Sequence, residues 1–244
     1  MRFLVAPADV RLDAVGWLFL VVMCVLLPLG ALRQHQRLAA GIQHPTRTRI
    51  YASAIGTHLV FVLMVWAVIR DAELDLFPPY RPSVLHVAIG LLALAVGLLP
   101  ALERFRLKDP IAQERVRLIA PRTSTEFGVF YLLSATAGIA EELTYRGLLF
   151  TLLGALVRSW VIAALIAAGV FGIVHLFQGW KAAGIAALMG VREQIVVGLT
   201  GTLFVAIVVH ALHDAIAGTV IGLRARRDEL ARAQGEGEAS HAVS

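Results

Sequence analysis

Charged side chains are scarce in this sequence. Asp, Glu, Lys and Arg make up 16% of its 244 residues, whereas soluble domains carry about 25%. Cysteine is almost absent, since Cys24 is the only one, and this excludes an internal disulfide and a CxxC metal site. Hydrophobic residues make up 58% and the mean hydropathy is +0.76. This composition excludes an ordinary water-soluble domain and indicates a membrane protein.

Long apolar runs fill most of the chain. A helix needs about 20 apolar residues to cross the hydrocarbon core of a bilayer. The first run exceeds the 7–15 residues or so of a signal-peptide core, so we interpret it as an anchor. The sixth is the least apolar, because Arg192, Glu193 and Gln194 interrupt it. The sequence predicts an all-α fold, a polytopic transmembrane helix bundle of about seven spans. The runs lie near residues 14–32, 51–69, 83–102, 127–153, 159–178, 184–200 and 202–223.

Basic residues gather in alternate connections between these runs. The net charge is +5, but no basic face with interleaved aromatic residues points to nucleic acid. Arginine and lysine cluster instead within 33–49, 104–122 and 224–232, which fall on one side of a seven-span bundle. Cytoplasmic loops carry such an excess. We therefore predict a multi-pass protein of the plasma (inner) membrane with an external N-terminus and a cytoplasmic C-terminus.

Two segments outside the apolar runs have their own pattern. Charged and apolar residues alternate over 103–126, which is typical of a helix lying in the membrane interface. Residues 228–244 are rich in Ala, Gly, Glu and Ser. We predict a cytoplasmic loop with an interfacial helix for the first segment and a frayed tail for the second.

Three charged residues interrupt the fourth apolar run. Glu141, Glu142 and Arg146 have apolar sequence on both sides, although a charged side chain at mid-bilayer costs about 2.5–3.5 kcal/mol on the insertion scale. Glu142 and Arg146 are four residues apart, so they share a helix face and can pair. Glu141 points about 100° away from Glu142. A structural ion pair explains Glu142 with Arg146 but leaves Glu141 without a structural purpose.

Two later runs also carry ionisable residues. Phe171 and His175 share a face in the fifth run, and His210 and Asp214 share a face in the seventh by the same spacing. A lone intramembrane histidine is often structural, and we interpret His58 and His86 that way. Ionisable groups on three helices are different, because they can converge in the bundle core. There a carboxylate can act as a general base while histidines polarise water or hold an oxyanion.

The motifs Glu141-Glu142-x-x-x-Arg146, Phe171-x-x-x-His175 and His210-x-x-x-Asp214 resemble those of the CPBP family. These are the CAAX-type and bacteriocin-processing intramembrane proteases, also called the Abi family. The motif order matches, and the resemblance covers roughly residues 125–222. It divides the chain into N-terminal helices and a cytoplasmic loop (1–124), catalytic helices (125–223) and a cytoplasmic tail (224–244).

The resemblance implies a peptidase that acts on membrane-associated or prenylated CAAX-type substrates in contact with membrane lipid. Glu141 would activate water with help from His175, His210 and Asp214 would stabilise the oxyanion, and Arg146 would orient Glu141 and Glu142. The final position is often asparagine in the family, and an ionised Asp214 suits a metal or a histidine better than an oxyanion. These residue types are competent zinc ligands, but there is no His-Glu-x-x-His helix, so the requirement for a divalent metal stays open.

Two other functions fit the same residues. A non-catalytic membrane scaffold would bind a partner or peptide with the same cavity, although every motif position is filled. A proton-coupled transporter also uses buried carboxylates and histidines, but transporters usually show repeat symmetry and broken half-helices, and neither is evident in this sequence. The peptidase is the primary hypothesis.

Overall fold

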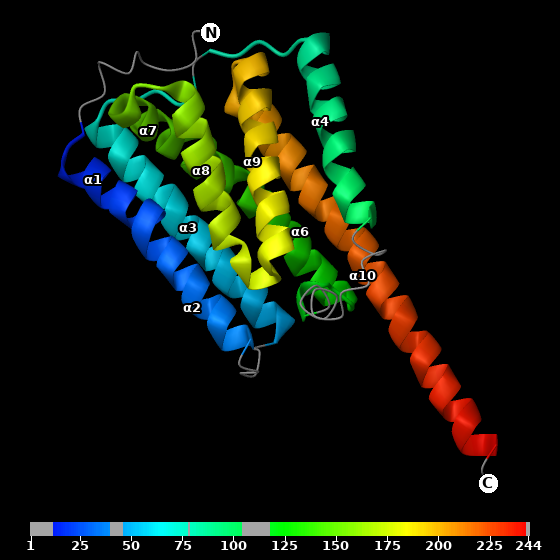
Figure 1. Ribbon diagram of the computed structural model, residues 1–244. Helices are drawn as coiled ribbons and strands as arrows, with labels where there is room; N and C mark the ends of the chain where they lie inside the picture. The colour runs from blue at the N-terminus through cyan, green and yellow to red at the C-terminus, as the bar shows by residue number, and fades with distance from the viewer. Residues whose placement is uncertain (1–11, 40–45, 78, 104–117, 243–244) are drawn as a thin grey trace.

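The chain folds into a bundle of helices (Figure 1), described by a computed structural model over residues 12–39, 46–77, 79–103 and 118–242. Within these ranges there are seven continuous helices and no strand, which confirms the all-α prediction. Two of the seven are built from segments of different helix type joined end to end. The helices are α1 (Ala14–Val21) with η1 (Val22–Leu26) and α2 (Leu27–Ala39); α3 (Arg47–Asp71); α4 (Val84–Glu103); α6 (Ser124–Glu141) with η3 (Glu142–Leu149) and α7 (Phe150–Val157); α8 (Trp160–Val174); α9 (Trp180–Thr200); and α10 (Leu203–Ala242).

Four of these helices are long and apolar enough to cross a membrane. They are Ala14–Leu38, Arg47–Asp71, Trp180–Thr200 and Leu203–Leu230. The first and third of them correspond to the predicted anchor and to the interrupted sixth run. Two shorter apolar helices, Val84–Leu99 and Trp160–Val174, accompany them. The chain is therefore a helical membrane protein.

The ends of the helices form two opposite faces of the bundle. In Figure 1, α2 ends, α3 begins, α6 begins and α10 ends toward the lower end. The connections from α3 to α4, from α7 to α8 and from α9 to α10 lie at the upper end. Successive connections thus alternate between the two ends of the bundle, and the described residues of the basic segments 33–49, 104–122 and 224–232 lie toward the lower end. The interfacial helix predicted within 103–126 falls mostly on 104–117, outside the described residues.

Two predicted boundaries were wrong. The fifth run, predicted over 159–178, is helical only to Val174, and a 3₁₀ turn (η4, Leu176–Gln178) follows. This 3₁₀ turn ends at Gly179, whose φ of 101° lies in a region that favours glycine. The tail predicted to fray after residue 228 instead continues α10 to Ala242, in keeping with its Ala, Glu and Arg residues, which are strong helix formers.

Close approach of two helix pairs brings the later helices together. A Cβ at Gly138 of α6 would lie 2.7 Å from the backbone oxygen of Ile207 on α10. A Cβ at Gly172 of α8 would lie 2.7 Å from the oxygen of Ala183 on α9. Small residues at such contacts let membrane helices pack backbone to backbone. The contact at Gly138 lies one turn from the acidic residues of α6 and brings α10 against them.

Candidate active site

The helix that carries Glu141, Glu142 and Arg146 changes its hydrogen bonding at these residues. A capping box between Thr123 and Glu126 starts α6, and Glu141 is its last residue. The next segment, η3, is a π-helix in which every residue from Glu142 to Leu149 is buried. The sequence predicted a regular α-helix here. π-Helical segments within α-helices are frequently found at functional sites, and this one follows Glu141 directly.

Glu142 lies in a closed environment with two cationic or hydrogen-bonding partners. Its side chain is fully buried. Its Oε1 lies 3.1 Å from Nη1 of Arg146, as the spacing predicted, and 2.6 Å from Nδ1 of His210 on α10. The Arg146 guanidinium also lies over the Phe171 ring, with Cζ 4.2 Å from the ring centroid. Glu142 and Arg146 therefore tie η3 to α10 and α8.

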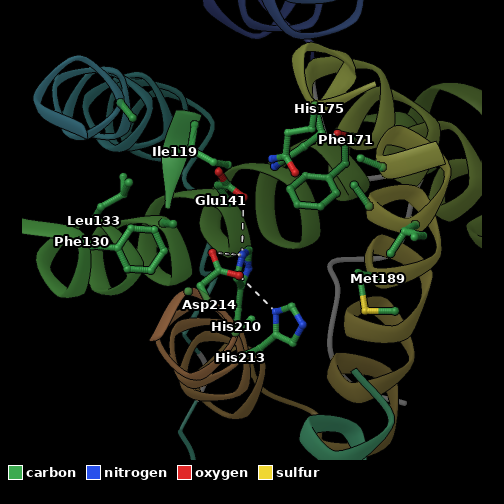
Figure 2. A pocket seen from close by; sticks show the side chains of 18 of the residues that line it. Ile119, Phe130, Leu133, Glu141, Phe171, His175, Met189, His210, His213 and Asp214 are labelled. Carbon is green, nitrogen blue, oxygen red and sulfur yellow. Dashed lines mark hydrogen bonds and ion pairs between the residues drawn. The ribbon is translucent and has the colours of Figure 1, made fainter. Parts of the chain in front are cut away.

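Glu141 faces a different direction and lines a cavity. Its Oε2 lies 3.6 Å from Nε2 of His210. That distance is an ion-pair contact and is too long for a good hydrogen bond. The two neighbouring carboxylates are therefore separated as predicted: Glu142 is sealed in the protein, and Glu141 is open to the cavity (Figure 2).

His175 occupies the end of α8, on the opposite wall of the cavity from α10 (Figure 2). Its Nδ1 donates to the carbonyl oxygen of Phe171, 2.8 Å away, one of the last carbonyls of the helix. In the neutral ring this leaves Nε2 as an acceptor. The rings of Phe171 and His175 lie 4.5 Å apart, as expected from their shared face. His175 thus presents Nε2 as an acceptor on the wall of the cavity that Glu141 also lines.

Two histidines flank Asp214 on α10. Its Oδ2 lies 3.6 Å from Nε2 of His210, and its Oδ1 lies 3.1 Å from Nδ1 of His213. His213 in turn donates from Nε2 to the backbone oxygen of Gly97 on α4, 3.1 Å away. Asp214 therefore interacts with two histidines in this structure, which suits an ionised carboxylate. Its side chain remains 35% exposed, and it also lines the cavity.

The cavity that joins these residues has a volume of about 320 Å³. Its polar wall combines carboxylates, histidines and Arg146, while an apolar wall continues along α6, α9 and α10. Figure 2 shows Glu141, His210 and Asp214 on one side and Phe171 and His175 across from them. All predicted site residues except the sealed Glu142 line it. These lining residues are Glu141, Arg146, His175, His210 and Asp214.

Arg192 and Glu193, which interrupt the apolar sequence of α9 (Trp180–Thr200), form an ion pair at the same cavity. Arg192 donates from Nη1 to the backbone oxygen of Ala93 on α4, 3.1 Å away. Glu193 is 1% exposed. Arg192 and Glu193 therefore pair with each other and also line the cavity.

A bound metal does not fit this arrangement well. Among the described residues, no group of three His, Cys, Asp or Glu side chains is arranged to hold one metal ion. The hydrogen bonds of His210, His213 and His175 go to carboxylates and backbone carbonyls. We therefore derive no chemical step through a metal.

Sequence reasoning missed two residues of this site. His58 on α3, interpreted as structural, lines the cavity and lies 3.3 Å from Glu141. His213 lies next to Asp214, but its contact with Gly97 links it to a helix more than a hundred residues earlier. Helical spacing within one run does not reveal either contact. The available signal was only the presence of an ionisable residue in an apolar run.

Comparison with known proteins adds one match. Residues 123–216 match the family model described as type II CAAX prenyl endopeptidase Rce1-like. No curated protein and no solved structure matches the chain. The matched segment begins at the N-cap of α6 and extends to the middle of α10, so it contains every residue of the three motifs.

Proposed function

Because residues 123–216 match the family model of Rce1-like CAAX prenyl endopeptidases, we propose that the chain belongs to this family and is an intramembrane endopeptidase. Glu141 activates a water molecule that attacks a peptide bond of a membrane-associated, CAAX-type substrate. The observation that carries the proposal is the convergence of Glu141, His175 and His210 on one cavity, while Glu142, paired with Arg146, is sealed away from it.

Glu141 is suited to be the general base. It is a carboxylate that reaches the cavity, and a base must contact the attacking water directly or through one further water. Water gives a proton to Glu141 and its hydroxide adds to the carbonyl carbon. The C–N bond then breaks, the proton passes to the leaving amine, and a carboxylic acid and an amine result. The acceptor nitrogen of His175 lines the same cavity and supports the base.

His210 is suited to stabilise the developing oxyanion. Its Nδ1 is held by Glu142 at 2.6 Å, which orients the ring. Its Nε2 lies 3.6 Å from both Glu141 and Asp214, so a hydrogen on this nitrogen is not committed to a short bond. A preorganised donor at such a position typically raises the reaction rate by a factor of about 10²–10³. Asp214 acts on the oxyanion indirectly, through the two histidines.

The family match and the cavity lining both support this substrate class. Beside the polar cluster the cavity is lined by apolar side chains, among them Phe130, Leu133 and Ile221. An apolar group attached near the scissile bond would lie against this wall, and its removal from water would favour binding. A prenylated CAAX-type peptide has this character.

Hydrolysis by purified protein in lipid nanodiscs tests the proposal. Wild-type protein should cleave a farnesylated CAAX-type peptide internally, and mass spectrometry should locate the new ends. The same peptide without the lipid should be cleaved more slowly. Glu141→Gln should abolish cleavage, while Glu126→Gln, a control on the same helix that keeps the capping side chain, should not. Binding of the peptide by wild type without any cleavage would contradict the enzyme and favour a binding protein.

We further propose that the lower end of the bundle in Figure 1 is cytoplasmic. The described basic residues Arg33, Arg37, Arg47 and Arg49 lie where α2 ends and α3 begins, at the same end of the bundle as the C-terminus of α10. Reporter fusions after Leu38 and at the C-terminus should both report the cytoplasm. A periplasmic or external signal from the C-terminal fusion would contradict this orientation.

A further inference from the structure

His58 of α3 lies on the cavity wall and contacts the proposed base. It is 7% exposed and lines the cavity. Its ring lies between two side chains of α6. Nδ1 is 3.1 Å from Oγ1 of Thr136, and Nε2 is 3.3 Å from Oε1 of Glu141.

The direction of these hydrogen bonds follows from the number of available hydrogens. The Thr136 hydroxyl donates to the backbone oxygen of Leu133, 3.0 Å away. A hydroxyl has a single hydrogen, so Oγ1 of Thr136 accepts from His58, and Nδ1 of His58 carries a hydrogen. On the other side of the ring, Nε2 and the carboxylate oxygen must share one hydrogen, since two lone pairs facing each other at 3.3 Å would repel. Thr136 thereby orients the imidazole toward Glu141.

This contact makes the two oxygens of Glu141 different. Oε1 is engaged by His58, whereas Oε2 lies 3.6 Å from Nε2 of His210 and has the longer contact. When one oxygen of a carboxylate is held by a hydrogen bond, the orientation of the other oxygen is fixed as well. A misplacement of about 1 Å can cost about 10²-fold in rate, so the orientation of the base matters.

We propose that His58 is a positioning residue for the peptidase reaction. It holds Glu141 by Oε1, so that Oε2 faces the substrate and accepts the proton of water. Thr136 maintains the ring orientation. This inference rests on the function proposed above, in which Glu141 is the base, and it adds a residue of the N-terminal helices to a site otherwise made by the motif helices.

Two amide variants separate positioning from simple packing. The amide nitrogen of glutamine in His58→Gln takes the place of Nε2 and can still donate to Glu141. The shorter side chain in His58→Asn takes the place of Nδ1, so it reaches Thr136 but not Glu141. Both variants bring the same polar group into the same buried place. If His58 has only a structural role, the two variants should have similar activity. If it positions Glu141, only His58→Gln should keep its activity.

Steady-state cleavage of the farnesylated peptide in nanodiscs, normalised to folded protein, gives the readout. We expect His58→Asn to lower kcat by about 10²-fold with KM unchanged, and His58→Gln to stay close to wild type. Thr136→Val should lower kcat by a smaller factor, and Thr136→Ser, which keeps the hydroxyl, should not. Thermal unfolding of each variant reports folding separately from turnover.

Three outcomes overturn the inference. Equal kcat for His58→Asn and His58→Gln shows that contact with Glu141 does not matter. A rise in KM with unchanged kcat would assign His58 to substrate binding instead. Absence of hydrolysis by the wild type overturns the proposed function and this inference together, whereas loss on Glu141→Gln with no loss on His58→Asn overturns only the inference.

Discussion

Glu141 and Glu142 are adjacent in the chain but belong to two regions with different properties. The first region is the set of cavity-lining residues Glu141, His175, His210 and Asp214. The second is a buried cluster formed by Glu142, Arg146 and Phe171, of which only Glu142 has no part in the cavity lining. In the buried cluster Glu142 is sealed by Arg146 and His210. On the cavity wall, the polar groups are held at distances of about 3 Å or more and reach open space.

This difference shows that residue type alone does not assign a role. Two glutamates with the same intrinsic chemistry have different environments because the helix directs one toward the cavity and the other into the packing. His210 belongs to both regions, since Nδ1 contacts the buried cluster and Nε2 faces the cavity. Changes in the buried cluster should therefore alter stability first, and changes on the cavity wall should alter turnover first.

The largest effect is expected from Arg146→Ala in the buried cluster. This change leaves the Glu142 carboxylate without its 3.1 Å ion pair. Breaking a buried pair on one side costs about 3–5 kcal/mol. We expect a strong drop in folded protein together with lost activity, measured by thermal unfolding and by the yield of monodisperse protein. Arg158→Ala, outside the cluster, provides the matched arginine control. An Arg146→Ala protein of wild-type stability would remove the distinction between the two regions.

A smaller effect is expected where the buried side of α6 meets α10. In Gly138→Ala the new methyl group would lie 2.7 Å from the Ile207 oxygen and 2.9 Å from Ala211 Cβ, so the helices must separate. Overpacking of this kind typically costs about 1–3 kcal/mol. Gly128→Ala on the same helix has no atom within 4 Å of its added Cβ and should be neutral or slightly stabilising. Equal melting temperatures for the two variants would contradict the close packing.

The smallest effect is expected from Asp214→Asn on the cavity wall. Asparagine keeps the size of the side chain and supplies a permanent donor, but it weakens the hold on His210 and His213. Since Asp214 acts through these histidines, we expect a modest loss in kcat with unchanged stability, and no recovery on addition of zinc. Recovery with zinc, or loss of wild-type activity in a chelator, would identify Asp214 as part of a metal site instead.

Much of the fold was predictable because membrane helices are recognisable in a sequence as long apolar runs. The pairing of Glu142 with Arg146 and of Phe171 with His175 was also predictable, since both pairs are four residues apart on one helix. These features are local in the sequence. Family resemblance then identified which of the buried polar residues belong together, and the family match covers the same part of the chain.

Other features depend on contacts between distant segments. The π-helical hydrogen bonding of η3 lies in a fully buried segment, and no residue pattern marks it. The contact of His58 with Glu141 joins residues 83 positions apart. The end of α8 at Val174 was not visible in the apolar run, because Leu176 and Phe177 continue it in composition but not in conformation. Such features require the packed structure.

The most direct test compares the two adjacent carboxylates in one measurement. The single-turnover rate of peptide cleavage per folded molecule, together with the melting temperature, should be determined for Glu141→Gln and Glu142→Gln in nanodiscs. The account predicts that Glu141→Gln melts like the wild type but shows no cleavage. Glu142→Gln, which weakens the contacts with Arg146 and His210, should melt at a lower temperature and retain measurable cleavage in its folded fraction. Cleavage at the wild-type rate by Glu141→Gln would contradict the account.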